Sequence, residues 1–179
     1  MSDLLVKLYD LPDAGPKLER LRGAGIAIRR AAAYERNPVC AWVREHFGEG
    51  WAGECEAGFS RQPVSVFVAV RDGRLLGFAC YDCTFKGAFG PTGVLEGERG
   101  LGIGAGLLLK CLEAMAAEGY AYAVVGGAGE LAFYQRACGA VEIPGSTPGI
   151  YPPKLKCAGG LSRGRPVRAR ESAPTPETS

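Results

Sequence analysis

The chain has 179 residues, 47% of them hydrophobic and 22% charged, which is the composition of a globular protein large enough for one well-buried domain. Residues 152–179 hold six of the 21 basic residues but only two of the 19 acidic ones, so the rest of the chain is slightly acidic. Nucleic-acid binding needs clustered cations, and we therefore do not expect residues 1–151 to bind nucleic acid.

No apolar run approaches the roughly 20 residues that cross a bilayer, and the opening segment is too acidic for a secretory signal. Seven cysteines at dispersed positions indicate free thiols in a reducing compartment, so we expect a cytoplasmic protein without a membrane partner. Cys80 and Cys83 form a lone C-x-x-C pair, and the single histidine, His46, is distant in sequence. A zinc site needs a second ligand pair, so no metal is expected.

The first elements are short. The stretch LLVKLYDLP at 4–12 has strand character. Pro16 suits the first turn of a helix over 15–25, which Gly23 favours ending. A second strand, IAIRRA, is expected at 26–31.

A longer amphipathic helix follows at 37–50. Asn37 is the expected N-cap, Pro38 the first helical residue and Gly48 the stop. Residues 51–62 are compatible with either a loop or a further helix.

The middle of the chain predicts antiparallel strands. VSVFVAV and RLLGFACYD flank Asp72-Gly73, which is a strong hairpin turn signal. A third strand over 85–96 is interrupted by Gly90-Pro91, and because proline cannot donate to a strand ladder we expect a bulge or splay there.

A glycine-rich connection at 97–104 leads into a helix over 102–118 with one apolar face. The almost wholly apolar stretch at 120–129 predicts a buried strand, followed by a second amphipathic helix at 129–140 and a last strand at 140–145. The strand, connection, helix and strand together form a βαβ unit.

Four glycines, at positions 100, 102, 104 and 106, stand where this helix starts. The first N–H groups of a helix have no internal partner, and the macrodipole adds about half a positive charge there. Glycine lets a bulky anion approach these amides, and Arg99 adds a cation just upstream. The stretch therefore predicts a site for a phosphate-bearing ligand.

Two glycine-rich designs fit poorly. A Walker-type loop needs G-x-x-x-x-G-K-[ST], and the chain has no such lysine pair. Gly100, Gly102 and Ala105 match the spacing of a Rossmann fingerprint. That fingerprint requires a ribose-binding acid at a strand end about 20 residues later, whereas Glu118 ends a helix.

The stretch VLEGERGLGIG resembles motif A of the GNAT superfamily of N-acetyltransferases, [Q/R]-x-x-G-x-[G/A], with Arg99, Gly102 and Gly104 at the defining positions. The resemblance implies that the loop amides hold the pyrophosphate of acetyl-CoA and that the preceding strand carries its pantetheine arm. The implied cofactor-binding residues are Thr92, Gly93, Val94, Arg99, Gly100, Leu101, Gly102, Ile103, Gly104 and Ala105.

ELAFYQRACGAV is similar to the motif B helix of that family, so the resemblance covers roughly 64–143. It implies that Tyr134 is the general acid that protonates the departing thiolate, and that the backbone at 92–94 stabilises the thioester oxygen. From the sequence alone, Tyr134 beside Phe133 also fits a core aromatic.

The general base is open, because 85–95 holds no carboxylate. Glu54 and Glu56, close to an aromatic in sequence, fit a pocket for a cationic amine as well as a solvated helix face. The other candidates are Asp82, His46, Glu96 and a water relay without a dedicated base.

Two departures from the family pattern stand out. A glycine-rich run, GGAG at 126–129, replaces the asparagine that many relatives carry before motif B. Residues 1–25 precede the family's usual first strand, and they either add a strand to the sheet edge or mediate a homodimer.

We therefore expect a single α/β domain over 1–151, with a mixed, mostly antiparallel sheet split by a V-shaped splay and flanked by helices. The composition of 152–179 predicts a disordered basic tail. The expected function is acetyl transfer from acetyl-CoA to a primary amine of a small-molecule or protein acceptor. The alternatives are a CoA-binding sensor without catalysis and, less favoured, a nucleotide-dependent oxidoreductase.

Overall fold

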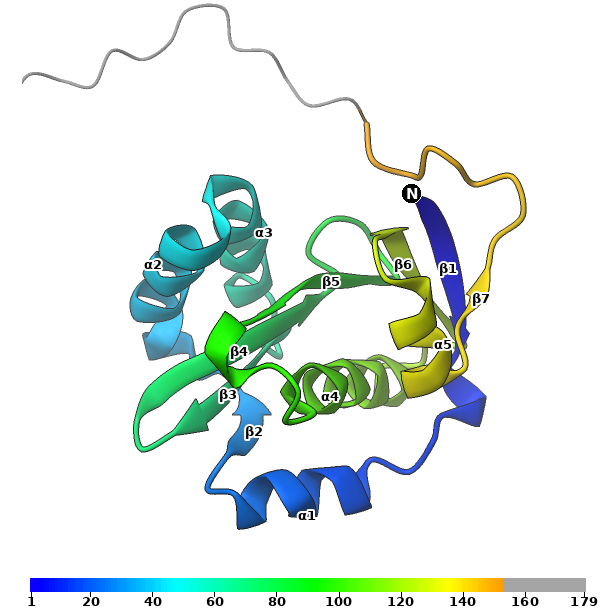
Figure 1. Cartoon of the computed structure of the whole chain (residues 1–179). Helices are drawn as coiled ribbons and strands as arrows, with labels where there is room; N and C mark the ends of the chain where they lie inside the picture. Colours follow the sequence, from blue (N-terminus) through cyan, green and yellow to red (C-terminus); the bar gives the residue numbers. More distant parts are fainter. Residues whose placement is uncertain (153–179) are drawn as a thin grey trace, which may run out of the picture.

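The computed structural model of the chain describes residues 1–152 (Figure 1). Its strands are β1 (Ser2–Lys7), β2 (Ala27–Arg30), β3 (Val66–Arg71), β4 (Arg74–Tyr81), β5 (Ala88–Val94), β6 (Tyr122–Ala128) and β7 (Val141–Glu142). Its α-helices are α1 (Gly15–Gly23), α2 (Arg36–Phe47), α3 (Glu49–Phe59), α4 (Ile103–Ala117) and α5 (Leu131–Cys138). Three short 3-10 turns, Leu8–Asp10, Ala33–Glu35 and Glu96–Glu98, join them.

All of the strands belong to one sheet with the order β2-β3-β4-β5-β6-β1-β7. Every neighbouring pair is antiparallel except β5 and β6, which are parallel. This confirms the expected mixed, mostly antiparallel sheet. The β3–β4 hairpin closes at Asp72-Gly73, as its turn signal predicts.

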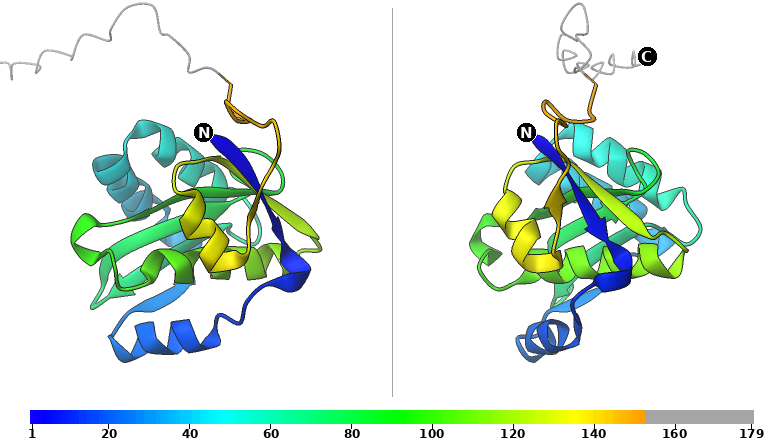
Figure 2. Two further views of the ribbon diagram at one scale, coloured as in Figure 1. Left: turned by 45° about the vertical axis from the view of Figure 1, so that its right-hand side comes forward. Right: turned by 90° about the vertical axis from the view of Figure 1, so that its right-hand side faces the viewer.

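Helices cover both faces of the sheet (Figures 1 and 2). On one face, α2 and α3 pack on a cluster that includes Val43, Cys55, Val66 and Phe78. On the other face, α4 lies at the centre of a larger cluster that also takes in α1, α5 and β1. Because α4 is in contact with neighbours nearly all round, it is apolar nearly all round.

The N-terminal strand enters the sheet as an interior strand. β1 pairs with β6 through Val6 opposite Ala123 and with β7 through Leu4 opposite Glu142. The expectation of an added edge strand is therefore corrected, because β7 lies outside β1. The apolar side chains of Leu4 and Val6, on one face of the strand, are fully buried against the α4 cluster.

In the region after β2, the structure settles 51–62 in favour of the further helix and differs from the sequence prediction at the start of α2. Residues 51–62 contain a helix, α3, which Gly48 separates from α2 by adopting a φ of +93°. Asn37 is not the N-cap of α2, because the helix begins at Arg36 and Glu35 takes the capping position. A 3-10 turn, Ala33–Glu35, lies directly before the helix. The helix is therefore capped at Glu35, two residues before the Asn37 that the sequence indicates.

No helix in residues 1–152 is long and apolar enough to cross a membrane. The six cysteines of this part are free thiols, five of them buried. The predicted tail, 152–179, lies outside the described residues apart from its first residue.

Candidate active site

The expected splay lies between β5 and β6. The two strands pair only at Ala88 with Val124 and at Phe89 with Val125, close to the start of β5. From Thr92 to Val94, β5 pairs with β4 alone, and among the described residues the edge that faces β6 has no strand partner. This edge presents backbone N–H and C=O groups to any extended ligand that enters the gap.

A bulge accompanies the splay. Phe89 lies opposite Tyr81 and Thr92 opposite Ala79, so Gly90 and Pro91 together face one residue of β4. The extra residue bends β5 and increases its twist, which turns its second half away from β6. The interruption predicted from Gly90-Pro91 is thus confirmed.

The loop between β5 and α4 depends on two glycines in left-handed conformations. Gly100 has a φ of +84° and Gly102, directly before the helix, a φ of +88°. A side chain would be strained at either position, although both have open space around them. The loop therefore reaches the helix by a tight turn that leaves its backbone uncovered.

The N–H groups at the start of α4 are free to bind an anion. Gly106 is the first residue to donate back to Gly102, at 3.0 Å, and no acceptor in residues 1–152 takes the N–H groups of Ile103 to Ala105. A Cβ on Gly104 would lie 3.7 Å from Val94 and 3.8 Å from Phe133. The open amides thus lie between the end of β5 and α5, next to the splay.

Arg99 is exposed and forms no ion pair with the described residues. Its neighbour Glu98 is bound by Arg71 at 2.5 Å, which offsets the negative charge closest to the loop. Arg99 therefore remains available to a phosphate group.

Gly106 has a different role from the other three glycines. A Cβ there would lie 2.5 Å from Ile28 and 2.9 Å from Leu21, so the residue is small because α4 packs closely on β2 and α1. The four alternating glycines therefore meet different requirements: a left-handed backbone at Gly100 and Gly102, and close packing at Gly106.

Tyr134 on α5 lies at the point where β5 and β6 part. Its ring centroid is 5.0 Å from that of Phe133 and 6.3 Å from that of Phe89, the last residue of β5 that pairs with β6. Burial raises the pKa of Tyr134 to about 12, with smaller contributions from nearby groups that include Tyr151. The phenol therefore keeps its proton throughout the neutral range.

The opposite side of β5 is aromatic. Gly93 has no side chain because a Cβ would lie 2.5 Å from the ring of Phe47. That ring stacks on Trp51 of α3, with centroids 5.6 Å apart, and Trp51 is 39% exposed. α2 and α3 thus place an accessible aromatic surface next to the second half of β5.

The structure separates the two carboxylates proposed from the sequence. Glu56 forms ion pairs with Arg44 at 3.1 Å and with Arg36 at 3.9 Å. Glu54 instead accepts a hydrogen bond from Thr84, in the loop that precedes β5. The two residues are two positions apart on α3, so their side chains diverge and do not form a common pocket.

The remaining base candidates are held elsewhere. Asp82 accepts hydrogen bonds from the Gly87 N–H at 2.7 Å and the Tyr120 hydroxyl at 2.7 Å, and pairs with Arg61 at 2.9 Å. Its carboxylate is saturated and orders the β4–β5 loop. His46 is exposed beside Trp42, and Glu96 is exposed in the 3-10 turn that follows β5.

Sequence reasoning missed Tyr151. A Cβ on Gly126 would lie 2.9 Å from Tyr151 and 3.1 Å from Ile150, so these side chains occupy the space next to β6. Burial and the carboxylate of Glu54 raise the pKa of Tyr151, whereas Thr84 lowers it. The sequence signal for Tyr151 is the Gly126-Gly127 pair. Two adjacent glycines in a strand indicate that another segment of the chain packs closely against it.

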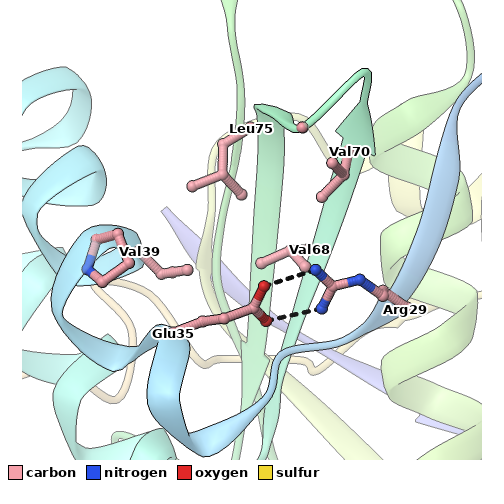
Figure 3. A pocket seen from close by; sticks show the side chains of 8 residues that line it. Arg29, Glu35, Val39, Val68, Val70 and Leu75 are labelled. Carbon is pink, nitrogen blue, oxygen red and sulfur yellow. Dashed lines mark hydrogen bonds and ion pairs between the residues drawn. The ribbon is translucent and has the colours of Figure 1, made fainter.

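Two small hollows lie away from the splay. One, of about 230 Å³, is walled by Val39, Val68 and Leu75, with the Arg29–Glu35 ion pair at its mouth (Figure 3). The hydrogen bonds from Arg29 lower the pKa of Glu35 to about 2. The other, of about 220 Å³, lies between α1 and β2. Neither contains the residues of the glycine-rich loop.

A mixed sheet that parts beside a glycine-rich helix start, with helices on both faces, defines an α/β fold of the acetyltransferase class. Among solved structures, a GCN5-related glucosamine N-acetyltransferase region of a fungal multi-domain beta-N-acetylglucosaminidase has a TM-score of 0.65 at 18% identity. GCN5-related N-acetyltransferases from Sphaerobacter thermophilus and Kribbella flavida have TM-scores of 0.57 and 0.53 at 22% and 20% identity.

Each of these likenesses covers 79% of this chain but only 19%, 48% and 53% of the respective neighbour. No curated protein sequence matches the chain. The family model "Acetyltransferase (GNAT) family" matches residues 29–140. The chain belongs to this family, and its fold is the fold of these neighbours.

Proposed function

We propose that this protein transfers the acetyl group of acetyl-CoA to a primary amine. The observation that carries the proposal is that the open N–H groups of Ile103 to Ala105 adjoin the parting of β5 and β6. The first feature suits a pyrophosphate, and the second leaves a strand edge for an extended arm that ends in a thioester.

Acetyl-CoA supplies the activated acyl group, and this chain's residues orient it. We assign the pyrophosphate to the backbone from Gly100 to Ala105, with Arg99 as a supporting cation, and the pantetheine arm to the edge of β5. The absence of side chains at Gly100 and Gly102 supports this, because nothing lies within 4 Å of either missing Cβ and the backbone of the loop is left uncovered.

In the chemical step, the amine nitrogen bonds to the thioester carbonyl carbon and the carbon–sulfur bond breaks. Backbone N–H groups of 92–94 stabilise the negative charge on the carbonyl oxygen. Tyr134 donates its proton to the departing thiolate, and its position beside Phe89 supports this role. We assign Glu54 to accept the proton that the amine loses, since Glu56 is already paired with two arginines.

The test has two stages. Calorimetry should show binding of acetyl-CoA and CoA but not of NADH, and a thiol-release assay over a panel of primary amines should then show turnover. NADH binding in place of acetyl-CoA would favour an oxidoreductase and contradict the proposal.

A CoA-binding sensor is the alternative that one observation favours. The Gly126-Gly127 pair stands where many relatives carry an asparagine, and Tyr151 covers it. Tight binding of acetyl-CoA without turnover on any amine would support the sensor.

A further inference from the structure

The segment that follows β7 holds Tyr151 in place. The Asp3 N–H donates to the Ser146 hydroxyl at 2.9 Å, and the Asp3 carboxylate accepts the Gly127 N–H at 2.8 Å. These bonds tie the segment to β1 and to the end of β6, and Figure 2 shows it next to the N-terminus. Tyr151 lies five residues after Ser146, so its backbone is anchored close to β6.

Tyr151 covers β6 at the point where β5 and β6 part. A Cβ on Gly126 would lie 2.9 Å from the Tyr151 ring, and one on Gly127 would lie 3.3 Å from it. Gly126 directly follows Val125, the last residue of β6 that pairs with β5. Val125 belongs to the α4 cluster and side chains alternate along a strand, so Gly126 faces the side of the sheet that carries α3. Tyr151 therefore lies on the α3 side of the splay.

Thr84 connects Tyr151 to Glu54. The Thr84 hydroxyl donates to the Glu54 carboxylate, and it also forms a hydrogen bond with the Tyr151 phenol. A hydroxyl has one proton to donate and two lone pairs to accept with. Because the Thr84 proton is directed to Glu54, its oxygen can accept the proton of Tyr151. The three side chains thus form a continuous chain of hydrogen bonds that begins at the splay and ends on α3.

The loop that carries Thr84 is itself well fixed. Asp82, whose side chain is fully buried, accepts the Gly87 N–H across the loop at 2.7 Å. On the other side, Cys83 packs on α3 so closely that a Cβ on Gly58 would lie 2.8 Å from its sulfur. Thr84 follows directly after Cys83, so its hydroxyl is positioned by the loop and does not depend on the bond to Glu54 alone.

Tyr151 also approaches the proposed acid. Its proximity contributes to the raised pKa of Tyr134, which packs on the α4 cluster, so the two phenols face each other across the splay. The proposed function assigns Tyr134 to the sulfur of the thioester. In the tetrahedral intermediate the amine nitrogen is bonded to the same carbon as that sulfur. A group that serves the nitrogen must therefore lie close to Tyr134, and Tyr151 meets this requirement.

Tyr151 can pass a proton on but is not itself the base. Burial and the Glu54 carboxylate raise the pKa of Tyr151, so the phenol keeps its proton at neutral pH. A neutral phenol accepts a proton only if it gives up its own at the same time. The negative charge needed to draw the proton away lies at the other end of the chain, on Glu54.

We propose that Tyr151 and Thr84 relay the proton of the amine to Glu54. The inference rests on the proposed function and adds the path by which its base acts. As the nitrogen bonds to the acetyl carbon, its proton moves to the Tyr151 oxygen, the Tyr151 proton moves to the Thr84 oxygen, and the Thr84 proton moves to Glu54. The carbon–sulfur bond breaks and the thiolate takes the Tyr134 proton. Glu54 then gives its proton to water, and Tyr134 recovers one from water.

The experiment measures steady-state kinetics of the full-length protein with acetyl-CoA and the best amine of the panel. Thr84→Val keeps the shape of the side chain but removes the hydroxyl, so kcat should fall about 100-fold while the KM for acetyl-CoA stays nearly unchanged. Thr84→Ser should restore most of the rate. Tyr151→Phe should lose as much as Thr84→Val, and the double variant no more than either, because the two hydroxyls act in series. Tyr34→Phe, a change at an 86% exposed ring, is the matched control and should keep full activity.

Two further measurements separate a relay from a structural role. In mixtures of H2O and D2O, the wild-type kcat should fall along a curve, because several protons move in one step, and the curvature should decrease in Thr84→Val. In the free protein, NMR of ring-labelled tyrosine should show the Tyr151 resonance shifted by Thr84→Val but not by Thr84→Ser, with Tyr34 unmoved. Thermal melting checks that the variants are folded.

The outcomes distinguish this inference from the proposed function. Wild-type kcat in Thr84→Val, a Thr84→Ser variant as slow as Thr84→Val, losses that multiply in the double variant, or an unmoved Tyr151 resonance would each overturn the relay. The proposed function would stand in all four cases, since the wild-type protein still acetylates the amine. Absence of turnover by the wild-type protein on every amine would overturn both.

Discussion

At the scale of single residues, surroundings decide which polar groups are available for chemistry. Asp82 and Glu56 carry the same functional group as Glu54, but the first is saturated by three donors and the second by two arginines. Tyr134 instead lies at the parting of the strands, beside Phe89. The three carboxylates have the same intrinsic reactivity, so what distinguishes them is where each one lies and which groups it is bonded to.

Gly104→Glu should abolish acetyl-CoA binding without unfolding the protein. A carboxylate would stand among the open amides of α4, where like charges cost several kcal/mol, so we expect the Kd to rise at least about 100-fold. Gly104→Ala is the matched control, because its Cβ makes ordinary contacts of 3.7 and 3.8 Å. Calorimetry measures the Kd and thermal melting the fold. Unchanged affinity in Gly104→Glu would contradict the assignment of the loop.

Tyr134→Phe should lower kcat by about 100-fold or more while leaving the KM for acetyl-CoA nearly unchanged, because only the proton donor is lost. Since the pKa of Tyr134 is raised to about 12, the wild-type rate should rise as the amine deprotonates and should not decline below about pH 10. Steady-state kinetics against pH check both points. A wild-type decline near neutral pH, or full activity in the variant, would assign the acid elsewhere.

At the scale of elements, the sequence predicted what local signals determine. The hairpin at Asp72-Gly73, the interruption of β5 at Gly90-Pro91 and the turn into α4 all depend on the backbone preferences of glycine and proline. The position of β1 and the contact of Tyr151 with Gly126 depend on residues more distant in sequence. Periodicity says which side chains of β1 are buried but does not identify the strands beside it.

The connection from β2 to α2 supplies a prediction on pH. Arg29 holds Glu35 by two hydrogen bonds, of 2.6 and 2.7 Å, and Glu35 also accepts the Ala32 N–H at 2.8 Å. The pKa of Glu35 is lowered to about 2, below the roughly 4.3 of an unfolded glutamate, so its stabilisation is present above pH 4.3 and is lost as the pH falls toward 2.

Glu35→Gln should therefore lower the free energy of unfolding at pH 7 by up to about 1 kcal/mol, because the pair is partly exposed. The difference from wild type should shrink as the pH falls from about 5 to about 2. Glu45→Gln, an exposed change of the same charge on α2, should have no such effect. Thermal melts over this pH range give the answer, and a constant difference would refute the role of the ion pair.

At the scale of the whole molecule, the two ends of the domain stabilise one another. β1 lies between β6 and β7, and the Ser146 hydroxyl then accepts the Asp3 N–H at the start of β1 (Figure 2). This arrangement also supports the site. β6 forms one wall of the splay, and β1 pairs with the opposite edge of β6.

Leu4→Ala should lower the free energy of unfolding by about 2–5 kcal/mol, because Leu4 is fully buried in the interior strand. Leu101→Ala is the matched control: Leu101 is 48% exposed, and its truncation should cost less than about 0.5 kcal/mol. Urea denaturation measures both. Equal effects would mean that β1 is a peripheral strand whose loss the sheet tolerates.

The interior position of β1 has a consequence for biosynthesis. The first strand leaves the ribosome long before its partners, since Leu4 must wait for Val125 and Glu142. Until then an apolar strand with two unpaired edges is exposed, which is the kind of segment that chaperones bind and that aggregates when left uncovered. The sheet cannot close until the chain as far as Glu142 has left the ribosome, so β1 stays unpaired while the rest of this domain is synthesised.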